Sequence, residues 1–194
     1  PLKLLFESNK SETMTKNQST KESSELKRIL IIGNGGRENS IAWALSKNKS
    51  IDNIYVCPGI GGTANFDKCI CLNPKSKDEQ NIIFECQRLK INLVIIGPEV
   101  PLAEGLANKM REAGITVFGP SKEGAQIEAS KDWAKTLMVE NNIPTAKYWT
   151  TQSKEEALQI LDKFKQPLVI KADGLAAGKG VTVCETIEQS KNAI

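Results

Sequence analysis

The run RILIIGNGGRE, residues 28–38, decides the fold of this chain. It opens with the apolar segment Arg28-Ile-Leu-Ile-Ile32, which predicts a parallel strand that is buried on both faces. A glycine-rich turn follows at once, and beyond it Ile41, Ala42 and Leu45 recur at helical spacing. A strand, a glycine turn and a helix in this order are typical of the first unit of an α/β sheet.

The same rhythm continues further along the chain. Four more apolar runs read as strands, at residues 53–57, 69–72, 93–96 and 115–118. Helical faces lie between several of them, formed by Ile82, Ile83, Cys86 and Leu89 and then by Leu102, Leu106 and Met110. Strands that alternate with helices predict an α/β domain with an open, mostly parallel sheet.

The two ends of the chain differ from this central part. Residues 1–27 are polar and lack apolar periodicity, which predicts a disordered leader. After Gly119 the pattern predicts a helix over residues 130–141, with Trp133, Leu137 and Met138 on its apolar side. A second helix follows, in which Ser153 and Glu156 form a capping box, and then strands at residues 167–171 and 181–183. We therefore expect one domain over residues 28–119 and the start of another over residues 120–194.

Composition excludes several classes of function. The 194 residues contain no histidine, which removes imidazole metal sites and Ser-His or Cys-His catalysis. The five cysteines fit no zinc spacing and are expected to be small buried residues in a reducing cytoplasm. The net charge of +3 is spread along the chain, so we expect no nucleic-acid partner. No apolar run approaches the roughly 18 residues that span a membrane.

The first glycine-rich loop, Gly33-Asn-Gly-Gly-Arg-Glu38, favours a bound phosphate. Glycines at Gly33, Gly35 and Gly36 let backbone N–H groups approach a ligand, and the helix that follows adds a positive dipole. Arg37 could add a bidentate contact. Nicotinamide binding fits less well, because the dinucleotide fingerprint needs glycine where Glu38 stands and a carboxylate at the end of the second strand. A purely structural turn is the remaining alternative.

Two further loops follow parallel strands and should lie at the same edge of the sheet. They are Pro58-Gly-Ile-Gly-Gly-Thr63 and Gly97-Pro-Glu-Val-Pro101. Ligands in open α/β sheets bind at the carboxyl ends of the strands. Glu99 is therefore expected to accept hydrogen bonds from a sugar hydroxyl or an amine, with an ordinary loop carboxylate as the alternative.

The second glycine-rich loop, Lys171-Ala-Asp-Gly-Leu-Ala-Ala-Gly-Lys-Gly180, is not a Walker A loop. Three residues instead of four separate Gly174 from Gly178, and Gly180 stands where Ser or Thr is required. A glycine-rich hairpin between two strands instead favours a lid over nucleotide phosphates, with Lys171 and Lys179 as its charges. A plain surface hairpin is the alternative.

Seven segments, in order and in spacing, resemble the phosphoribosylamine–glycine ligase family of ATP-grasp enzymes. The most specific is Val169-Ile-Lys-Ala-Asp-Gly-Leu-Ala-Ala-Gly-Lys-Gly-Val181. The other six are Gly33-Asn-Gly-Gly-Arg-Glu38, Pro58-Gly-Ile-Gly-Gly-Thr63, Gly97-Pro-Glu-Val-Pro-Leu102, Phe118-Gly-Pro-Ser121, Ala129-Ser-Lys-Asp132 and Ile143-Pro-Thr-Ala146. One departure is Asn39, where the family usually has histidine.

The resemblance implies a fold and a reaction. The fold is an open parallel, Rossmann-like pre-ATP-grasp domain followed by the start of an ATP-grasp domain. In the reaction, ATP phosphorylates glycine and the amine of 5-phosphoribosylamine attacks, giving glycinamide ribonucleotide, ADP and phosphate. Another ATP-grasp carboxylate–amine ligase and a non-catalytic nucleotide-binding module are the alternatives.

The resemblance also assigns roles to residues. The phosphoribosylamine would be held by Gly33, Gly35, Gly36, Arg37, Glu38 and Glu99. ATP would be held by Lys131, Lys171, Asp173, Gly174, Gly178, Lys179 and Gly180. The catalytic residues and the ligands of Mg²⁺ or Mn²⁺ are expected downstream of Ile194. The chain is therefore expected to be an amino-terminal fragment that is inactive alone.

Overall fold

The computed structural model describes residues 27–72, 78–176 and 180–194, so the expected leader lies outside it except for Lys27. The first part of the described chain contains β1 (Arg28–Gly33), α1 (Gly36–Ser46), β2 (Asn53–Pro58), a 3-10 turn (Thr63–Asn65), β3 (Cys69–Cys71), α2 (Glu79–Arg88), β4 (Leu93–Ile96), α3 (Glu99–Glu104), α4 (Leu106–Glu112) and β5 (Val117–Phe118). The second part contains α5 (Lys122–Ala129), α6 (Lys131–Glu140), α7 (Lys154–Phe164), β6 (Val169–Lys171), β7 (Val181–Val183) and α8 (Ile187–Ala193).

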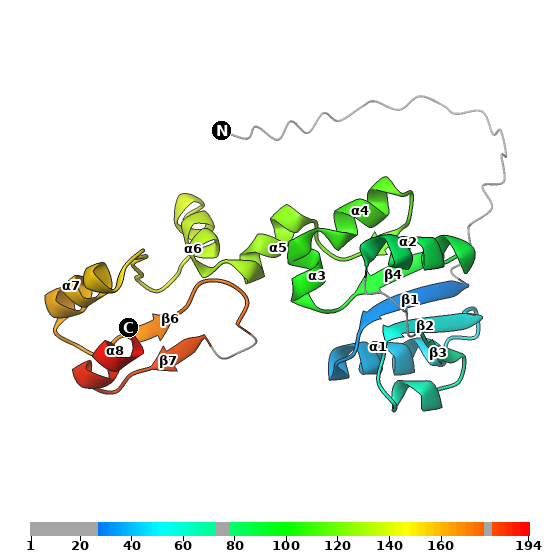
Figure 1. The fold of residues 1–194 in the computed structure, drawn as a ribbon, viewed down its shortest axis with the longest axis horizontal. Coiled ribbons are helices and arrows are strands. Elements are labelled where there is room, and N and C mark those ends of the chain that lie inside the picture. The colour runs from blue at the N-terminus through cyan, green and yellow to red at the C-terminus, as the bar shows by residue number, and fades with distance from the viewer. Residues whose placement is uncertain (1–26, 73–77, 177–179) are drawn as a thin grey trace, which may run out of the picture.

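Strands β1 to β5 form one parallel sheet in the order β3-β2-β1-β4-β5. The five apolar runs are thus confirmed as strands, and so is the open α/β architecture. The chain builds outward from β1 through β2 to β3, then returns to place β4 on the other side of β1 (Figure 1). The loops after β1 and β4 therefore separate at a topological switch point, where open α/β sheets bind ligands.

The sheet is buried on both faces because β1 alternates its side chains between two cores. Leu30 and Ile32 pack with residues of α2 and α4, whereas Ile29 and Ile31 pack with Ala42 of α1. In Figure 1, α1 accordingly lies on the face of the sheet opposite to α2 and α4. This two-sided burial explains why β1 is continuously apolar.

The helical face of Leu102, Leu106 and Met110 is buried as expected, but it is not one helix. Gly105 has a φ of 95°, in the left-handed region, and ends α3 before α4 begins. Leu102, Leu106 and Met110 are four residues apart, and this spacing is the same whether or not a single residue interrupts the helix. The sequence pattern therefore predicted one helix where the structure has two.

The second part of the chain contains the antiparallel hairpin of β6 and β7 with helices α5 to α8. Helix α5 lies beyond the boundary expected at Gly119, yet its Ala125 belongs to the core that α2 and α4 cover. The predicted apolar side of α6 is wrong in one respect, because the side chain of Trp133 is exposed. Cys71 is likewise exposed, while Cys57, Cys86 and Cys184 are buried. Over the residues described, no helix combines the length and hydropathy needed to cross a bilayer.

Candidate functional site

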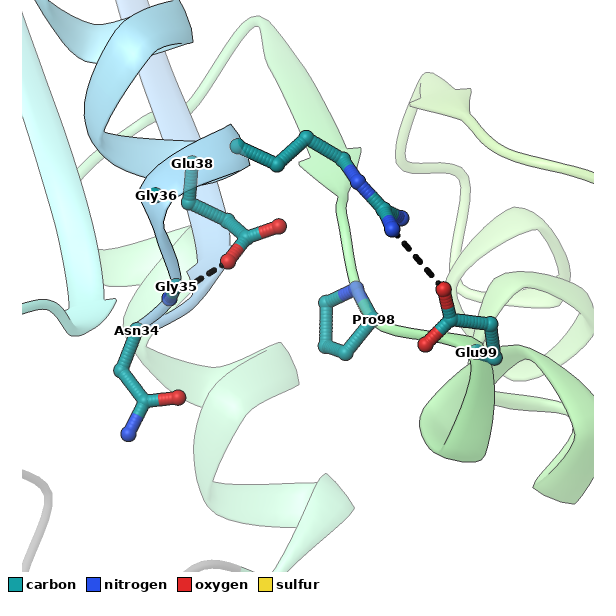
Figure 2. A pocket seen from close by; sticks show the side chains of 7 residues that line it. Asn34, Gly35, Gly36, Glu38, Pro98 and Glu99 are labelled. Carbon is teal, nitrogen blue, oxygen red and sulfur yellow. Dashed lines mark hydrogen bonds and ion pairs between the residues drawn. The ribbon is translucent and has the colours of Figure 1, made fainter. Parts of the chain in front are cut away.

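A hollow of about 320 Å³ opens at the switch point between β1 and β4 (Figure 2). It is lined by Asn34, Gly35, Gly36, Arg37, Glu38, Pro98 and Glu99. These residues come from the loop after β1, the first turn of α1 and the loop after β4. Of the three loops that were expected at this edge, those after β1 and β4 meet in the hollow. The loop after β2 does not line it, but the N–H of Gly59 donates to the carbonyl of Gly33 at 3.2 Å.

Glu38 is the buried centre of this arrangement. Its side chain is nearly inaccessible, and its Oε2 accepts a hydrogen bond of 2.7 Å from the N–H of Gly35. A Cβ added at Gly33, Gly35 or Gly97 would lie 2.6, 2.9 or 2.0 Å from the nearest atom of this carboxyl-bearing side chain. A side chain at any of these three positions would displace the Glu38 carboxylate, because the Glu38 side chain fills the space beside them.

The Gly35 N–H group is therefore already engaged by a carboxylate. Sequence reasoning expected it to approach a phosphate. Helix α1 begins at Gly36, so the N–H groups of its first turn have no carbonyl partners within the helix. Gly36 and Arg37 both line the hollow, and a Cβ at Gly36 would meet nothing within 4 Å. An anionic ligand thus has helix N–H groups available at Gly36 and Arg37 rather than at Gly35.

Arg37 joins the two loops. Its Nη1 donates to the carbonyl of Gly97 at 2.5 Å, and its Nη2 donates to Oε1 of Glu99 at 2.9 Å. The dashed line that ends on Glu99 in Figure 2 marks the second contact. The hydrogen bond from Arg37 lowers the pKa of Glu99, and the same bond raises the pKa of Arg37. Glu99 is therefore not a free loop carboxylate; it is ionised and paired.

Asn39 holds α1 against the loop that follows β2. Its Oδ1 accepts a hydrogen bond of 2.8 Å from the hydroxyl of Thr63, which is buried. The amide at this position thus has a definite structural partner, in the place where the resembling family usually has an imidazole.

A second group of expected site residues lies at the hairpin. Lys171 ends β6 with its side chain exposed, and the carbonyl of Gly180 accepts from Ala172 across the hairpin at 2.8 Å. Lys131 donates from Nζ to the carbonyl of Gly174 at 2.9 Å. Gly178 and Lys179 lie outside the described residues. Whether any of these residues contacts a nucleotide stays a prediction.

Asp173 has a role that sequence reasoning did not find. Its carboxylate lies at the amino end of α6 and accepts from residues 130 to 132. Burial raises the pKa of Asp173, but hydrogen bonds from the Lys131 backbone and the Ser130 hydroxyl outweigh burial, so its pKa is lowered overall. The partners are more than 40 residues apart in sequence, and no local pattern could have linked them. Asn34 and Pro98, which line the hollow, were also not singled out from the sequence.

Comparisons with known proteins indicate one family over residues 27–194. A family model for the phosphoribosylglycinamide synthetase N domain matches residues 27–128, and one for the ATP-grasp (A) domain of the same synthetase matches residues 129–194. The chain is 45% identical over 167 residues to a phosphoribosylamine–glycine ligase of Clostridium acetobutylicum, covering 86% of this chain and 40% of that protein.

Two solved structures extend the comparison. The phosphoribosylamine–glycine ligase of Thermotoga maritima matches with a TM-score of 0.65 and 32% identity, over 85% of this chain and 38% of that one. The biotin carboxylase domain of a Hydrogenobacter thermophilus 2-oxoglutarate carboxylase matches with a TM-score of 0.66 over 86% of this chain and 40% of that one. At 18% identity, this second likeness shows the fold alone. The chain spans about 40% of the length of these relatives.

Proposed function

Because this chain belongs to the phosphoribosylglycinamide synthetase family, we propose that its full-length protein ligates glycine to 5-phosphoribosylamine at the expense of ATP. A glycine carboxylate oxygen attacks the γ-phosphorus, the bond to the bridging oxygen breaks, and ADP leaves. The amine nitrogen then attacks the carbonyl carbon of glycyl phosphate and loses a proton. Phosphate leaves, and glycinamide ribonucleotide remains. The five free thiols fit a reducing compartment, which supports a cytoplasmic location.

The hollow at the switch point is the observation that carries this proposal. It offers both kinds of hydrogen-bonding group that phosphoribosylamine requires. The first turn of α1 and Arg37 suit a phosphate, because they provide N–H groups and a positive charge. Glu99 suits the amine or the ribose hydroxyls, because an ionised carboxylate is an acceptor only.

Arg37 and Glu99 would hold one another until the substrate arrives. The pair is exposed, so its attraction is screened by water and is weak. A dianionic phosphate competes well for Arg37, and this frees Glu99 for the donor groups of the sugar. The supporting parts, Gly33, Gly35 and Glu38, shape the loop without needing to touch the ligand.

ATP would bind at the junction of α6 with the hairpin. Lys131 and Lys171 would supply the positive charges there, and Gly174, Gly178, Lys179 and Gly180 would belong to the lid. The family model for the ATP-grasp (A) domain, which matches residues 129–194, supports nucleotide binding in this part of the chain. Within the residues described, no three His, Cys, Asp or Glu side chains cluster as metal ligands. We expect the carboxylates that hold the metal ion to lie downstream of Ile194.

The activity is tested by product analysis with the full-length protein. Glycine, ATP and freshly generated phosphoribosylamine should give glycinamide ribonucleotide, ADP and phosphate in equal amounts. ADP release that does not depend on glycine would contradict the proposal, and so would product formation without ATP.

Substitution of Gly36 by alanine tests the first site. The added methyl group meets open space in the protein but intrudes on the ligand, so folding should be unaffected. We expect the KM for phosphoribosylamine to rise about fivefold or more, since overpacking costs about 1 kcal/mol. The KM for ATP and the thermal midpoint are the internal controls and should not change. Gly35→Val is a poorer probe, because a Cβ there lies 2.9 Å from Oε2 of Glu38. A rise in the KM for ATP alone would show that this hollow is a nucleotide site.

A further inference from the structure

One carboxylate fastens the hairpin to helix α6. Oδ1 of Asp173 accepts from the backbone N–H of Lys131 at 2.6 Å and from that of Asp132 at 3.3 Å. Its Oδ2 accepts from the hydroxyl of Ser130 at 3.0 Å. Asp173 follows the end of β6 by two residues, so it connects the strand that carries Lys171 to the first turn of the helix that carries Lys131.

Lys131 is held at both of its ends. Its backbone N–H is bound by Asp173, and its Nζ donates to the carbonyl of Gly174, the next residue along the hairpin. The side chain of Lys131 is partly buried, in contrast to the exposed Lys171. The position of its ammonium group is therefore set by the hairpin as much as by α6.

Neighbouring contacts support this connection. The hydroxyl of Ser130 also caps α6, since it accepts from the N–H of Trp133 at 3.1 Å. The carboxylate of Asp132 accepts a hydrogen bond from the hydroxyl of Thr150. On the hairpin side, the Ala172 N–H bonds to the Gly180 carbonyl beside Asp173. Three segments of the second part of the chain thus meet at the amino end of α6.

We propose that Asp173 is a positioning residue that fixes the Lys131 ammonium relative to Lys171 and does not itself contact ATP. The proposal rests on the proposed function, which gives both lysines to the nucleotide. Both oxygens of Asp173 are engaged by donors, and an ionised carboxylate has no proton to offer a phosphate. Its direct approach to a phosphate would also be repulsive.

The expected loss of ATP affinity depends on the fraction of molecules in which Lys131 and Lys171 are both in the binding position. Without Asp173, the start of α6 and the hairpin lose their shared acceptor, and the bond from Lys131 Nζ to the Gly174 carbonyl is left to hold this lysine against the hairpin. If the competent fraction falls to about 10–30%, the apparent dissociation constant of ATP rises about 3–10-fold.

The test uses full-length protein and calorimetric titration with the non-hydrolysable analogue β,γ-imido-ATP. Asp173→Ala should weaken binding about 3–10-fold. Asp173→Asn should be close to the unmodified protein, because the amide keeps an acceptor for the Lys131 N–H and can donate to Ser130. Ser130→Ala, which removes one of the three donors, should give a smaller loss and serves if Asp173→Ala does not fold. In steady-state assays, the KM for ATP should rise and those for glycine and phosphoribosylamine should not.

Ser153→Ala is the matched control. Ser153 caps the neighbouring helix α7 by accepting from the Glu156 N–H at 3.2 Å, so its loss costs similar stability without touching Asp173. It should leave binding of the analogue unchanged. Unchanged binding in Asp173→Ala would overturn the positioning role while leaving the proposed function standing, and so would an equal loss in Asp173→Asn. If the unmodified protein does not bind the analogue, the proposed function itself fails.

Discussion

Replacing Gly97 with alanine is expected to destabilise the part of the chain built on the parallel sheet by about 1–3 kcal/mol, the usual cost of overpacking a filled site. The new Cβ would lie 2.0 Å from Oε1 of Glu38 and 2.5 Å from its Cδ. Glu38 also fills the space beside Gly33 and Gly35, so its carboxylate would be displaced toward the hollow that it lines. It must leave its buried place, and the Gly35 N–H then loses its partner. An earlier first thermal transition and faster amide exchange at Gly35 would report this change.

A double substitution shows whether Gly97→Ala destabilises the protein through the clash with Glu38 or by another change in the loop. If the clash with Glu38 is the cause, Gly97→Ala should add little to the destabilisation of Glu38→Ala. The coupling free energy between the two changes should then be about 1 kcal/mol or more. Gly36→Ala is the control, because its methyl group meets no protein atom within 4 Å. Additive effects of the two substitutions would refute the steric explanation.

Full-length protein with Lys171→Ala is expected to lose tenfold or more in ATP affinity or turnover, because a charge-assisted hydrogen bond contributes about 1.5–3 kcal/mol. Lys171 lies at the end of β6 with its side chain exposed, so truncating that side chain leaves no buried cavity. The thermal midpoint of the Lys171→Ala variant should therefore stay close to that of the unmodified protein.

Lys163 provides the control for this experiment. It is also an exposed lysine and lies in the last turn of α7, outside the residues expected to bind ATP. Lys163→Ala removes the same charge and should leave ATP kinetics unchanged. Normal ATP kinetics in Lys171→Ala would remove this lysine from the nucleotide site, and an equal loss in both variants would indicate only a long-range effect of net charge.

The strands of the first sheet could be predicted because their signal is local. Each strand is a short run of apolar residues, and the run of β1 is continuous because both of its faces are covered. The glycine loop was predicted to lie at the carboxyl ends of the parallel strands, but the strand order that makes this edge a switch point is known only from the structure. The sequence predicted that the loops carrying Arg37 and Glu99 lie at the same edge of the sheet. It did not predict the ion pair between them, because the two residues are 62 apart in sequence.

Other features could not be predicted. Some join residues that are distant in sequence, and others depend on atomic positions that residue spacing does not specify. The sequence indicated that glycines open the first loop for a ligand, but it could not show that Glu38 fills that space. The capping box at α7 is another example. Ser153 accepts from the Glu156 N–H as expected, but the Glu156 carboxylate bonds to the N–H of Gln152 at 3.1 Å, one residue before Ser153. Sequence spacing does not resolve a shift of one residue.

The contact between Asn39 and Thr63 has a consequence for the response of this region to pH. An imidazole at this position could accept a hydrogen bond from the Thr63 hydroxyl only through an unprotonated nitrogen. Acidification through about pH 6.5 would therefore weaken the contact between α1 and the loop after β2. The amide oxygen of Asn39 does not titrate. Glu99 and Asp173 have lowered pKa values, so the stability they add is complete above the ordinary carboxyl range and is lost only below about pH 4.

At the alkaline end, burial raises the pKa of the Cys86 thiol to about 11. The stability that this neutral thiol adds is complete below the ordinary thiol pKa of about 8.5 and is lost only as the pH rises above it. With no histidine in the 194 residues, the hold of α1 on the loop after β2 should be the same at pH 5 as at pH 8. A change in substrate affinity across that interval would then report the ionisation of the substrate phosphate, whose second pKa lies near 6, or of a group elsewhere in the full-length protein.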